Sequence, residues 1–120
     1  MAYYDDPEIQ PQRGHFIWAD FTPHAGHEQA GRRPAIILSP KIFNIGTGRL
    51  IACPITNQMR GGPFEVPLPL GMKPTGAVLV DQVRAIDWRA RNASFIGMAS
   101  AQFLDQVSAR LATILGMRYP

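Results

Sequence analysis

The hydrophobic pattern along most of the chain has the two-residue period of β-strands. Residues 15–21 (HFIWADF) alternate, so that Phe16 and Trp18 face one way and Ile17 and Ala19 face the other. Shorter apolar runs, bounded by proline and glycine, indicate further strands. The predicted strands are 15–21, 35–38, 50–56, 64–68, one long or bent strand or two strands over 76–88, and 94–98.

Polar stretches separate these strands. Residues 22–34 have no periodicity and predict a long loop, and residues 57–63 predict another. Residues 39–48 fit one helical turn, with Ser39 as its N-cap and Pro40 at its first position. Residues 1–13 are polar and acidic, so they are expected to form a flexible tail.

The last segment has the period of a helix. It runs from Ser100, a good N-cap residue, to Gly116, a residue typical of a helix stop. One face is apolar, which predicts an amphipathic helix packed on a sheet. That face comprises Phe103, Leu104, Val107, Leu111, Ile114 and Leu115. The order of elements predicts an α+β, mostly β fold: a small antiparallel barrel with a C-terminal helix.

Composition limits the protein class. The 120 residues fit one domain, and 46% hydrophobic with 18% charged residues is typical of a globular chain. No apolar run approaches the roughly 20 residues that span a bilayer. The first residues lack the features of a signal peptide, and one cysteine forms no internal disulfide. A cytoplasmic protein without a membrane partner is therefore expected.

The charge is unevenly distributed. Three of the nine acidic residues lie within the first eight positions, so the remaining six face twelve Lys and Arg, a net charge of about +6. A basic body suggests an anionic partner, either nucleic acid or an acidic protein segment. A basic protein without such a partner is the alternative.

The sequence lacks the residue patterns that several kinds of catalytic site require. His24 and His27 share a loop with Glu28, but no spacing matches a zinc finger or a metalloprotease helix, so no metal or other cofactor is expected. There is no phosphate-binding loop ending in Lys-Ser or Lys-Thr. Cys53 lies in an apolar strand before Pro54 and is interpreted as a buried core thiol.

The arginines remain as candidates for function. Guanidinium groups match phosphate geometry and stay charged at any relevant pH. Single-stranded RNA binding needs such cations together with aromatic stacking partners. The alternative is that most of these arginines are solvated and the aromatic rings lie in the core. The candidates are Arg32, Arg33, Arg60, Arg84, Arg89 and Arg91, with Trp18, Phe43, Phe64 and Trp88 as stacking partners.

Five segments together resemble one known family. They are GHEQAGRRPAIILSP (26–40), TGRLIACPITNQ (47–58), GGPFEVPLP (61–69), VLVDQVRAIDWRARNASFIG (78–97) and the terminal helix. In this order and spacing they resemble the MazF/PemK toxins, the ribonuclease toxins of type II toxin–antitoxin modules. The resemblance covers roughly residues 13–116 and implies one toxin domain over residues 14–120.

The resemblance implies a fold and an activity. Members are compact antiparallel barrels, similar in plan to Src-homology-3 domains, and act as homodimers. They cleave single-stranded RNA, usually messenger RNA, without metal, through attack by the RNA's own 2′-OH, and a cognate acidic antitoxin inhibits them. The family's catalytic positions fall on Arg33, Thr56 and Glu28, and either Glu28 or Arg33 would act as base. The expected RNA-binding residues are Gln58, Asp81 and Gln82 by resemblance, and Arg32, Arg60, Arg84 and Arg89 by charge.

The chain departs from common members at two positions, and two other functions are compatible with the fold. Asn57 stands where a second Thr or Ser is frequent, and Gly62 replaces a frequent Tyr. His24 and His27 lie outside the motif. A protein of this fold could instead inhibit a topoisomerase, although the terminal GMRYP does not resemble that class, or it could bind RNA without cleaving it. The pairing of Arg33 with Thr56 favours the ribonuclease.

Overall fold

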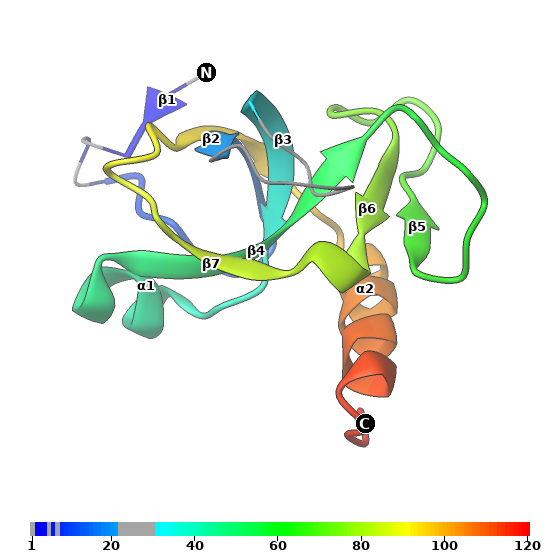
Figure 1. Ribbon diagram of the computed structural model, residues 1–120. Coiled ribbons are helices and arrows are strands. Elements are labelled where there is room, and N and C mark those ends of the chain that lie inside the picture. The colour runs from blue at the N-terminus through cyan, green and yellow to red at the C-terminus, as the bar shows by residue number, and fades with distance from the viewer. Residues whose placement is uncertain (1, 5, 7, 22–30) are drawn as a thin grey trace.

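A computed structural model describes residues 2–4, 6, 8–21 and 31–120. Figure 1 shows a strongly curved sheet with the longer helix, α2, standing against one side of it. The strands are β1 (Ala2–Tyr3), β2 (His15–Phe21), β3 (Gly31–Ile37), β4 (Arg49–Thr56), β5 (Glu65–Pro67), β6 (Ala77–Leu79), β7 (Arg84–Asp87) and β8 (Ser94–Met98). The helices are α1 (Lys41–Thr47), the 3₁₀ helix η1 (Val80–Gln82) and α2 (Ala101–Ile114).

The sheet is antiparallel but open. Its strands follow the order β1-β8-β2-β3-β4-β6-β5, and β7 pairs with β4 beside this path. The prediction of a mostly β, antiparallel fold with a C-terminal helix is confirmed, whereas the closed barrel is wrong in detail. The sheet has two ends because β1 and β5 do not pair with one another. Twist curves the sheet without joining these ends.

The core lies on both faces of the curved sheet. Alternation along β2 separates Phe16 from Ile17 and Ala19, as predicted, and sends them into two different hydrophobic clusters. One cluster includes Phe103 and Val107 of α2, and the other includes Trp88 from the connection between β7 and β8. The first three residues of β3 are exposed, whereas the adjoining ends of β2 and β4 are buried at Phe21 and Thr56.

Helix α2 begins after Ser100 and stops before Gly116, as predicted, but its last apolar residues are not buried. The Ser100 side chain accepts a hydrogen bond from the backbone N–H of Phe103, at 3.1 Å, which is an N-cap. Leu111 packs on the core, but Ile114 and Leu115 are 38% and 58% exposed. The last turn extends past the sheet, so periodicity alone overestimated the buried face.

Strand β3 begins earlier than predicted. Arg32 and Arg33 were expected in a loop, yet they pair with Asp20 and Ala19 of β2. Pro34, expected to bound the strand, pairs with Trp18 inside it. The cross-strand partners on β2 hold this segment extended in spite of its polar composition. The remainder of the predicted loop, residues 22–30, lies outside the described residues.

The region from 76 to 88 forms two strands. Strand β6 pairs with the last residues of β4, and β7 pairs with its first residues. The 3₁₀ helix η1 joins them and changes the chain direction. The sequence left a single bent strand or two strands open, and the structure has two.

Helix α1 is longer than the expected single turn, and Ser39 is not its cap. Pro40 occupies the N-cap position, and the Ser39 hydroxyl instead donates to Oδ1 of the buried Asn44. Asn44 Nδ2 also donates to the carbonyl of Pro11, at 2.9 Å, and the backbone carbonyl of Asn44 accepts from Trp88 Nε1, at 2.9 Å. One residue thus links α1, the N-terminal segment and the connection that follows β7.

The expectation of a separate tail does not hold for the described part of residues 1–13. Strand β1 pairs with β8, and the Tyr4 ring packs in the core. The Tyr4 hydroxyl lies 2.7 Å from Nδ1 of His15. The Arg13 guanidinium donates to Ser108 of α2, at 2.8 Å. Acidic composition did not reveal these few anchoring side chains.

Among the described residues, no helix combines the length and the apolar character needed to cross a bilayer.

The buried pair Tyr4–His15 makes stability depend on pH. Burial lowers the pKa of His15 from 6.5 to about 4. Between these values the unfolded chain binds a proton that the folded chain does not, so the free energy of unfolding falls as pH drops through this window. The loss is expected to be on the order of 1–3 kcal/mol.

Urea unfolding of the wild type and of His15→Gln at pH 7.5, 6 and 4.5 measures this effect. The pH dependence of the variant should be shallower than that of the wild type by the stated amount. Tyr4→Phe is the control, because it removes the hydroxyl but keeps the burial and therefore the pH dependence. Parallel wild-type and His15→Gln profiles would contradict the assignment.

Candidate functional site

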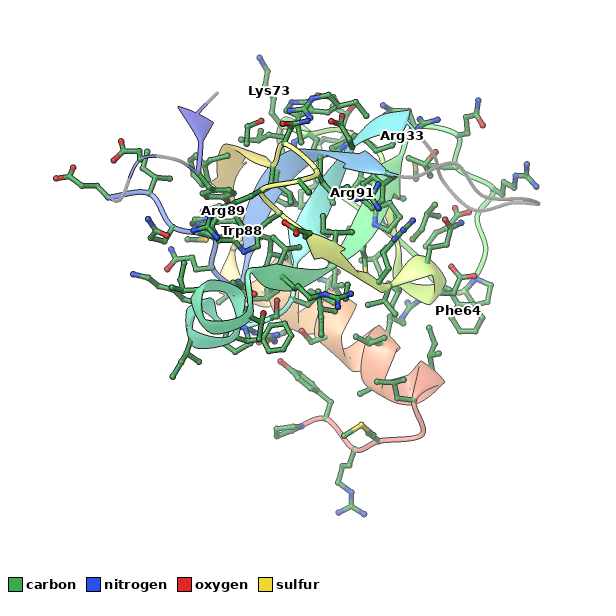
Figure 2. All side chains as sticks on the ribbon, turned by 60° about the vertical axis from the view of Figure 1, so that its left-hand side comes forward. Arg33, Phe64, Lys73, Trp88, Arg89 and Arg91 are labelled. Atoms are coloured by element: carbon green, nitrogen blue, oxygen red, sulfur yellow. The ribbon has the colours of Figure 1, made fainter. Side chains whose placement is uncertain are left out.

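The adjacent Arg32 and Arg33 lie on opposite faces of β3, because side chains alternate along a strand. Both are exposed at the outer end of that strand. In Figure 2, Arg33 lies at the upper end of the sheet. The two side chains therefore leave β3 on different faces and have different surroundings, although they carry the same charge.

Arg32 is held by a polar network. Its guanidinium bonds to Asp20 Oδ1, at 3.1 Å, and to the Ser94 hydroxyl, at 3.2 Å. Asn92 Nδ2 donates to the other oxygen of Asp20, at 2.8 Å. The hydrogen bonds from Asn92 and Arg32 hold the pKa of Asp20 below its ordinary value. This network ties the end of β2 and the start of β3 to Asn92 in the β7–β8 connection and to Ser94 of β8.

Arg33 and Thr56 lie near the ends of two neighbouring strands. The pairing of β3 with β4 runs from Ile37 and Ala52 to Ala35 and Pro54, so Arg33 and Thr56 each lie two residues beyond it. Thr56 is only 4% exposed, and its hydroxyl accepts from the backbone N–H of Gln58, at 3.0 Å. The predicted catalytic arginine and threonine are thus carried by neighbouring strands.

A cleft of about 650 Å³ is lined by Arg33, whereas Thr56 is not among its described lining residues. One wall comes from β2 and β3, and the other from the end of β4 and from the residues before β6. Arg32, Arg33 and Lys73 are its cations, and no carboxylate is among the described residues that line it. The cleft is lined by Trp18, Arg32, Arg33, Pro34, Ile55, Asn57, Gln58, Lys73, Pro74, Thr75 and Ile96.

Sequence analysis did not identify the residues before β6, Lys73 to Thr75, as one wall of a cleft. The Thr75 hydroxyl donates to Asn57 Oδ1, at 3.0 Å, although the residues are 18 positions apart. Gly76, with φ of +115°, crosses so close to β4 that a Cβ there would lie 2.2 Å from the Thr56 carbonyl oxygen. The Gly-Met-Lys-Pro-Thr-Gly segment, 71–76, carries a turn signal but no signal of where it packs. Figure 2 shows Lys73 at the same upper edge as Arg33.

Other predicted RNA-binding residues lie outside the cleft. Arg60 is exposed in the β4–β5 connection, where its backbone N–H and that of Gly61 bind the Glu65 carboxylate. Asp81 and Gln82 belong to η1. The Arg84 guanidinium lies 5.5 Å from the centre of the Phe21 ring, and that of Arg89 lies 4.0 Å from the centre of the Trp88 ring. Glu28, His24 and His27 lie outside the described residues.

The predicted stacking residues divide between surface and core. Trp88 is almost fully buried and belongs to the core, as the alternative interpretation had it. Phe64 is exposed, but it lies away from Arg33 and Lys73 in Figure 2. Trp18 is half-buried and lines the cleft. Of the four aromatic residues considered, Trp18 is the one that lines the cleft together with Arg32, Arg33 and Lys73.

Cys53 is a core residue rather than a nucleophile. It is fully buried, and burial raises its pKa to about 12, with a smaller contribution from Asp81. Within the described ranges, no three His, Cys, Asp or Glu side chains are grouped closely enough to bind a metal ion. The chemistry offered by the cleft is therefore that of fixed cations, amides and hydroxyls, which suit a phosphate-bearing ligand.

Comparison with protein families gives one match over most of the chain. Residues 12–115 match the family described as PemK-like, MazF-like toxin of type II toxin–antitoxin system. The endoribonuclease toxin MazF of Escherichia coli K12 is 43% identical over 106 residues, which is 88% of this chain and 95% of the relative.

Solved structures agree with this match. MazF from Deinococcus radiodurans has a TM-score of 0.86 and 48% identity, covering 91% of this chain and 99% of its own. A MazE–MazF structure from the same organism has a TM-score of 0.82 and 44% identity, covering 92% of this chain and all of the compared chain. The open sheet with a C-terminal helix is thus the fold of the MazF proteins.

Proposed function

The chain belongs to the family of PemK-like and MazF-like toxins of type II toxin–antitoxin systems, and from this premise we propose that it cuts single-stranded messenger RNA without a metal ion, through attack by the RNA's own 2′-OH. It is an endoribonuclease toxin of this family. The cytoplasm, where messenger RNA is translated, is its place of action.

The observation that supports this mechanism is the cleft lined by Arg32, Arg33 and Lys73, with no carboxylate among its described lining residues. Arg33 stands on β3, and Thr56 ends the neighbouring strand β4. A cation held on a strand is preorganised, since the sheet fixes its backbone before the substrate arrives. Such a group stabilises charge that develops in the transition state more effectively than mobile water does.

The reaction itself needs no protein nucleophile. The 2′-oxygen forms a bond to phosphorus, the bond from phosphorus to the 5′-oxygen breaks, and the 2′-proton passes to a base. A proton is then delivered to the departing 5′-oxygen. Arg33 binds the non-bridging oxygens as their charge increases, and the Thr56 hydroxyl orients one of them or the 2′-OH. Glu28 is the residue proposed as base, because the pKa of arginine exceeds about 12.

The remaining cations attract RNA rather than react with it. Arg32 is anchored by Asp20 and Ser94 and lines the cleft, so it is suited to bind a neighbouring phosphate. Gln58 lies next to it in the same cleft. Arg60, Arg84 and Arg89, with Asp81 and Gln82, extend the proposed RNA surface along the rest of the fold.

The partners follow from the family and from charge. The solved MazE–MazF structures are complexes of the Deinococcus radiodurans proteins. This toxin is proposed to act as a homodimer and to be inhibited by a cognate acidic antitoxin. The excess of twelve Lys and Arg over nine Asp and Glu favours an acidic inhibitor that competes with RNA.

Replacing Arg33 and Arg32 separately tests the site. Arg33→Ala should lower kcat about 10²–10³-fold, because it removes a preorganised donor from the transition state, while RNA affinity falls much less. Arg32→Ala should mainly weaken RNA binding and its salt dependence. Single-turnover cleavage of a short RNA and binding measured by fluorescence anisotropy separate these two effects.

The matched control is Arg118→Ala, which removes an exposed arginine beyond α2. Its kcat should equal that of the wild type. Equal losses of kcat for Arg32→Ala and Arg33→Ala would show that net charge decides the rate. An Arg33→Ala variant that still cleaves at nearly the wild-type rate would favour an RNA-binding module instead.

The products identify the attacking group. Fragments should end in a 2′,3′-cyclic phosphate and begin with a 5′-hydroxyl, and cleavage should persist in EDTA. RNA with a single 2′-deoxy residue at the cut site should resist cleavage. Mass spectrometry of the fragments checks both ends, and 5′-phosphate ends would overturn the mechanism.

Inhibition by the antitoxin should depend on salt and exclude RNA. An acidic C-terminal antitoxin peptide should displace labelled RNA from the toxin, and its affinity should fall as the salt concentration rises. A peptide with its acidic residues replaced by their amides is the control and should compete poorly. Simultaneous binding of peptide and RNA would rule out occlusion of the groove.

A further inference from the structure

We propose that Asp20, Asn92 and Ser94 are positioning residues that hold the Arg32 guanidinium in place for a phosphate group of the RNA. They come from β2, from the connection between β7 and β8, and from the start of β8, and sequence analysis gave none of them a role. This inference rests on the proposed function for its ligand, RNA, and adds the residues that prepare one cation of the cleft before RNA arrives.

Asp20 holds Arg32 without itself lining the cleft. Asp20 and Arg32 are cross-strand partners on β2 and β3, so their side chains lie on the same face of the sheet. Their ion pair is 3.1 Å long, and Arg32, but not Asp20, is among the described lining residues. Arginine has five N–H donors, and the bonds to Asp20 and Ser94 engage one on each terminal nitrogen. Within the described part of the chain, the remaining donors make no hydrogen bond and can bind a phosphate.

Ser94 is the fixed point of this network. It is fully buried, and its hydroxyl accepts from Arg32 Nη2, at 3.2 Å. Its backbone pairs with Trp18 of β2 on one side and with Tyr3 of β1 on the other. Strand β1 precedes the region 12–115 that matches the toxin family, so this chain supports Ser94 with residues beyond that region. The anchor is thus held on both sides before a ligand binds.

Asn92 adopts a backbone conformation that favours glycine, yet it keeps a side chain that bonds to Asp20. Its φ is +53°, in the left-handed region that glycine adopts at least cost. Its Nδ2 donates to Asp20 Oδ2, at 2.8 Å, while Arg32 binds the other oxygen. The bonds from Asn92 and then from Arg32 hold the pKa of Asp20 below its ordinary value, so the carboxylate is ionised at neutral pH. Both oxygens of Asp20 are engaged, which fixes its orientation.

Positioning and simple charge predict opposite effects for Asp20. The Arg32 and Asp20 side chains are 33% and 42% exposed, and an exposed ion pair adds little to stability. If only net charge mattered, removal of this carboxylate would strengthen RNA binding. If Asp20 positions Arg32, its removal weakens binding, because a mobile arginine must be immobilised when RNA binds. Immobilising one such side chain lowers affinity about two- to tenfold.

Replacing Asn92 with glycine tests the network without straining the backbone, because glycine suits the positive φ. The affinity of Asn92→Gly for an RNA with a 2′-deoxy residue at the cut site should fall about two- to tenfold, as measured by fluorescence anisotropy. Its kcat on cleavable RNA should remain that of wild type, because Arg33 and Thr56 are unchanged. A thermal melt verifies that the variant is folded.

Replacing Asp20 tests the sign of the effect. Asp20→Ala should weaken RNA binding at about 0.2 M salt, where charges more than roughly 8 Å apart are largely screened. Asp105→Ala is the matched control, because it removes an exposed carboxylate that bonds to Tyr119 and does not line the cleft. The control should bind RNA as tightly as wild type or slightly more tightly. If Asp20→Ala binds RNA as tightly as the control or more tightly, net charge decides and the positioning role is wrong.

A double-mutant cycle assigns the loss of affinity to Arg32. In an Arg32→Ala background, Asn92→Gly should cause no further loss, because no guanidinium is left to position. A further two- to tenfold loss in that background would refute the inference. Wild-type affinity for a folded Asn92→Gly variant would refute it as well.

The binding assay separates this inference from the proposed function. A protein that cleaves no RNA would refute the proposed function, while a loss of affinity in Asn92→Gly that disappears in the Arg32→Ala background would still support the network. Cleavage of RNA together with wild-type affinity for Asn92→Gly would refute the network alone.

Discussion

The fold depends on the pairing of strand β4 with three other strands. One edge of β4 pairs with β3 over Ala52 to Pro54, while its other edge pairs first with β7 and then with β6. Pro54 lacks a backbone N–H, and the change of partner from β7 to β6 occurs on either side of Cys53 and Pro54. The strand is therefore shared by the two halves of the sheet, and η1 crosses between them.

The proposed site is a consequence of this shared strand. Pairing with β3 places the strand that carries Arg33 beside the strand that carries Thr56, and pairing with β6 brings the segment with Thr75 against Asn57. Helix α2 takes no direct part and instead covers the core beneath through Phe103 and Val107. Each proposed group thus stands on a strand with a paired neighbour, Arg33 opposite Ala19 and Thr56 opposite Ala77, which suits a mechanism based on fixed charge.

The sequence predicts which helices and strands exist better than it predicts where each one begins and ends, and the reasons are physical. Alternation in β2 and the Ser100 cap are local properties, so they were read correctly. The early start of β3 depends on β2 as a partner, and the segment containing Arg32 and Pro34 has no strand pattern of its own. The anchoring of Asn44 and of the Asn57–Thr75 pair joins residues distant in sequence, which no single-sequence pattern encodes. The family motif pointed to Arg33 and Thr56, but a sequence motif does not show which residues line a cleft. Lys73, which lines the cleft, lies outside the motif segments.

The open sheet leaves β8 with an edge, and the chain covers that edge with its own first residues. Ala2 and Tyr3 pair with Phe95 and Ser94, and Tyr4 anchors the segment by packing beside His15 and Trp88. An uncovered strand edge is a template for pairing with another molecule. A segment whose composition predicts a flexible acidic tail thus covers, in the folded protein, part of the edge of β8.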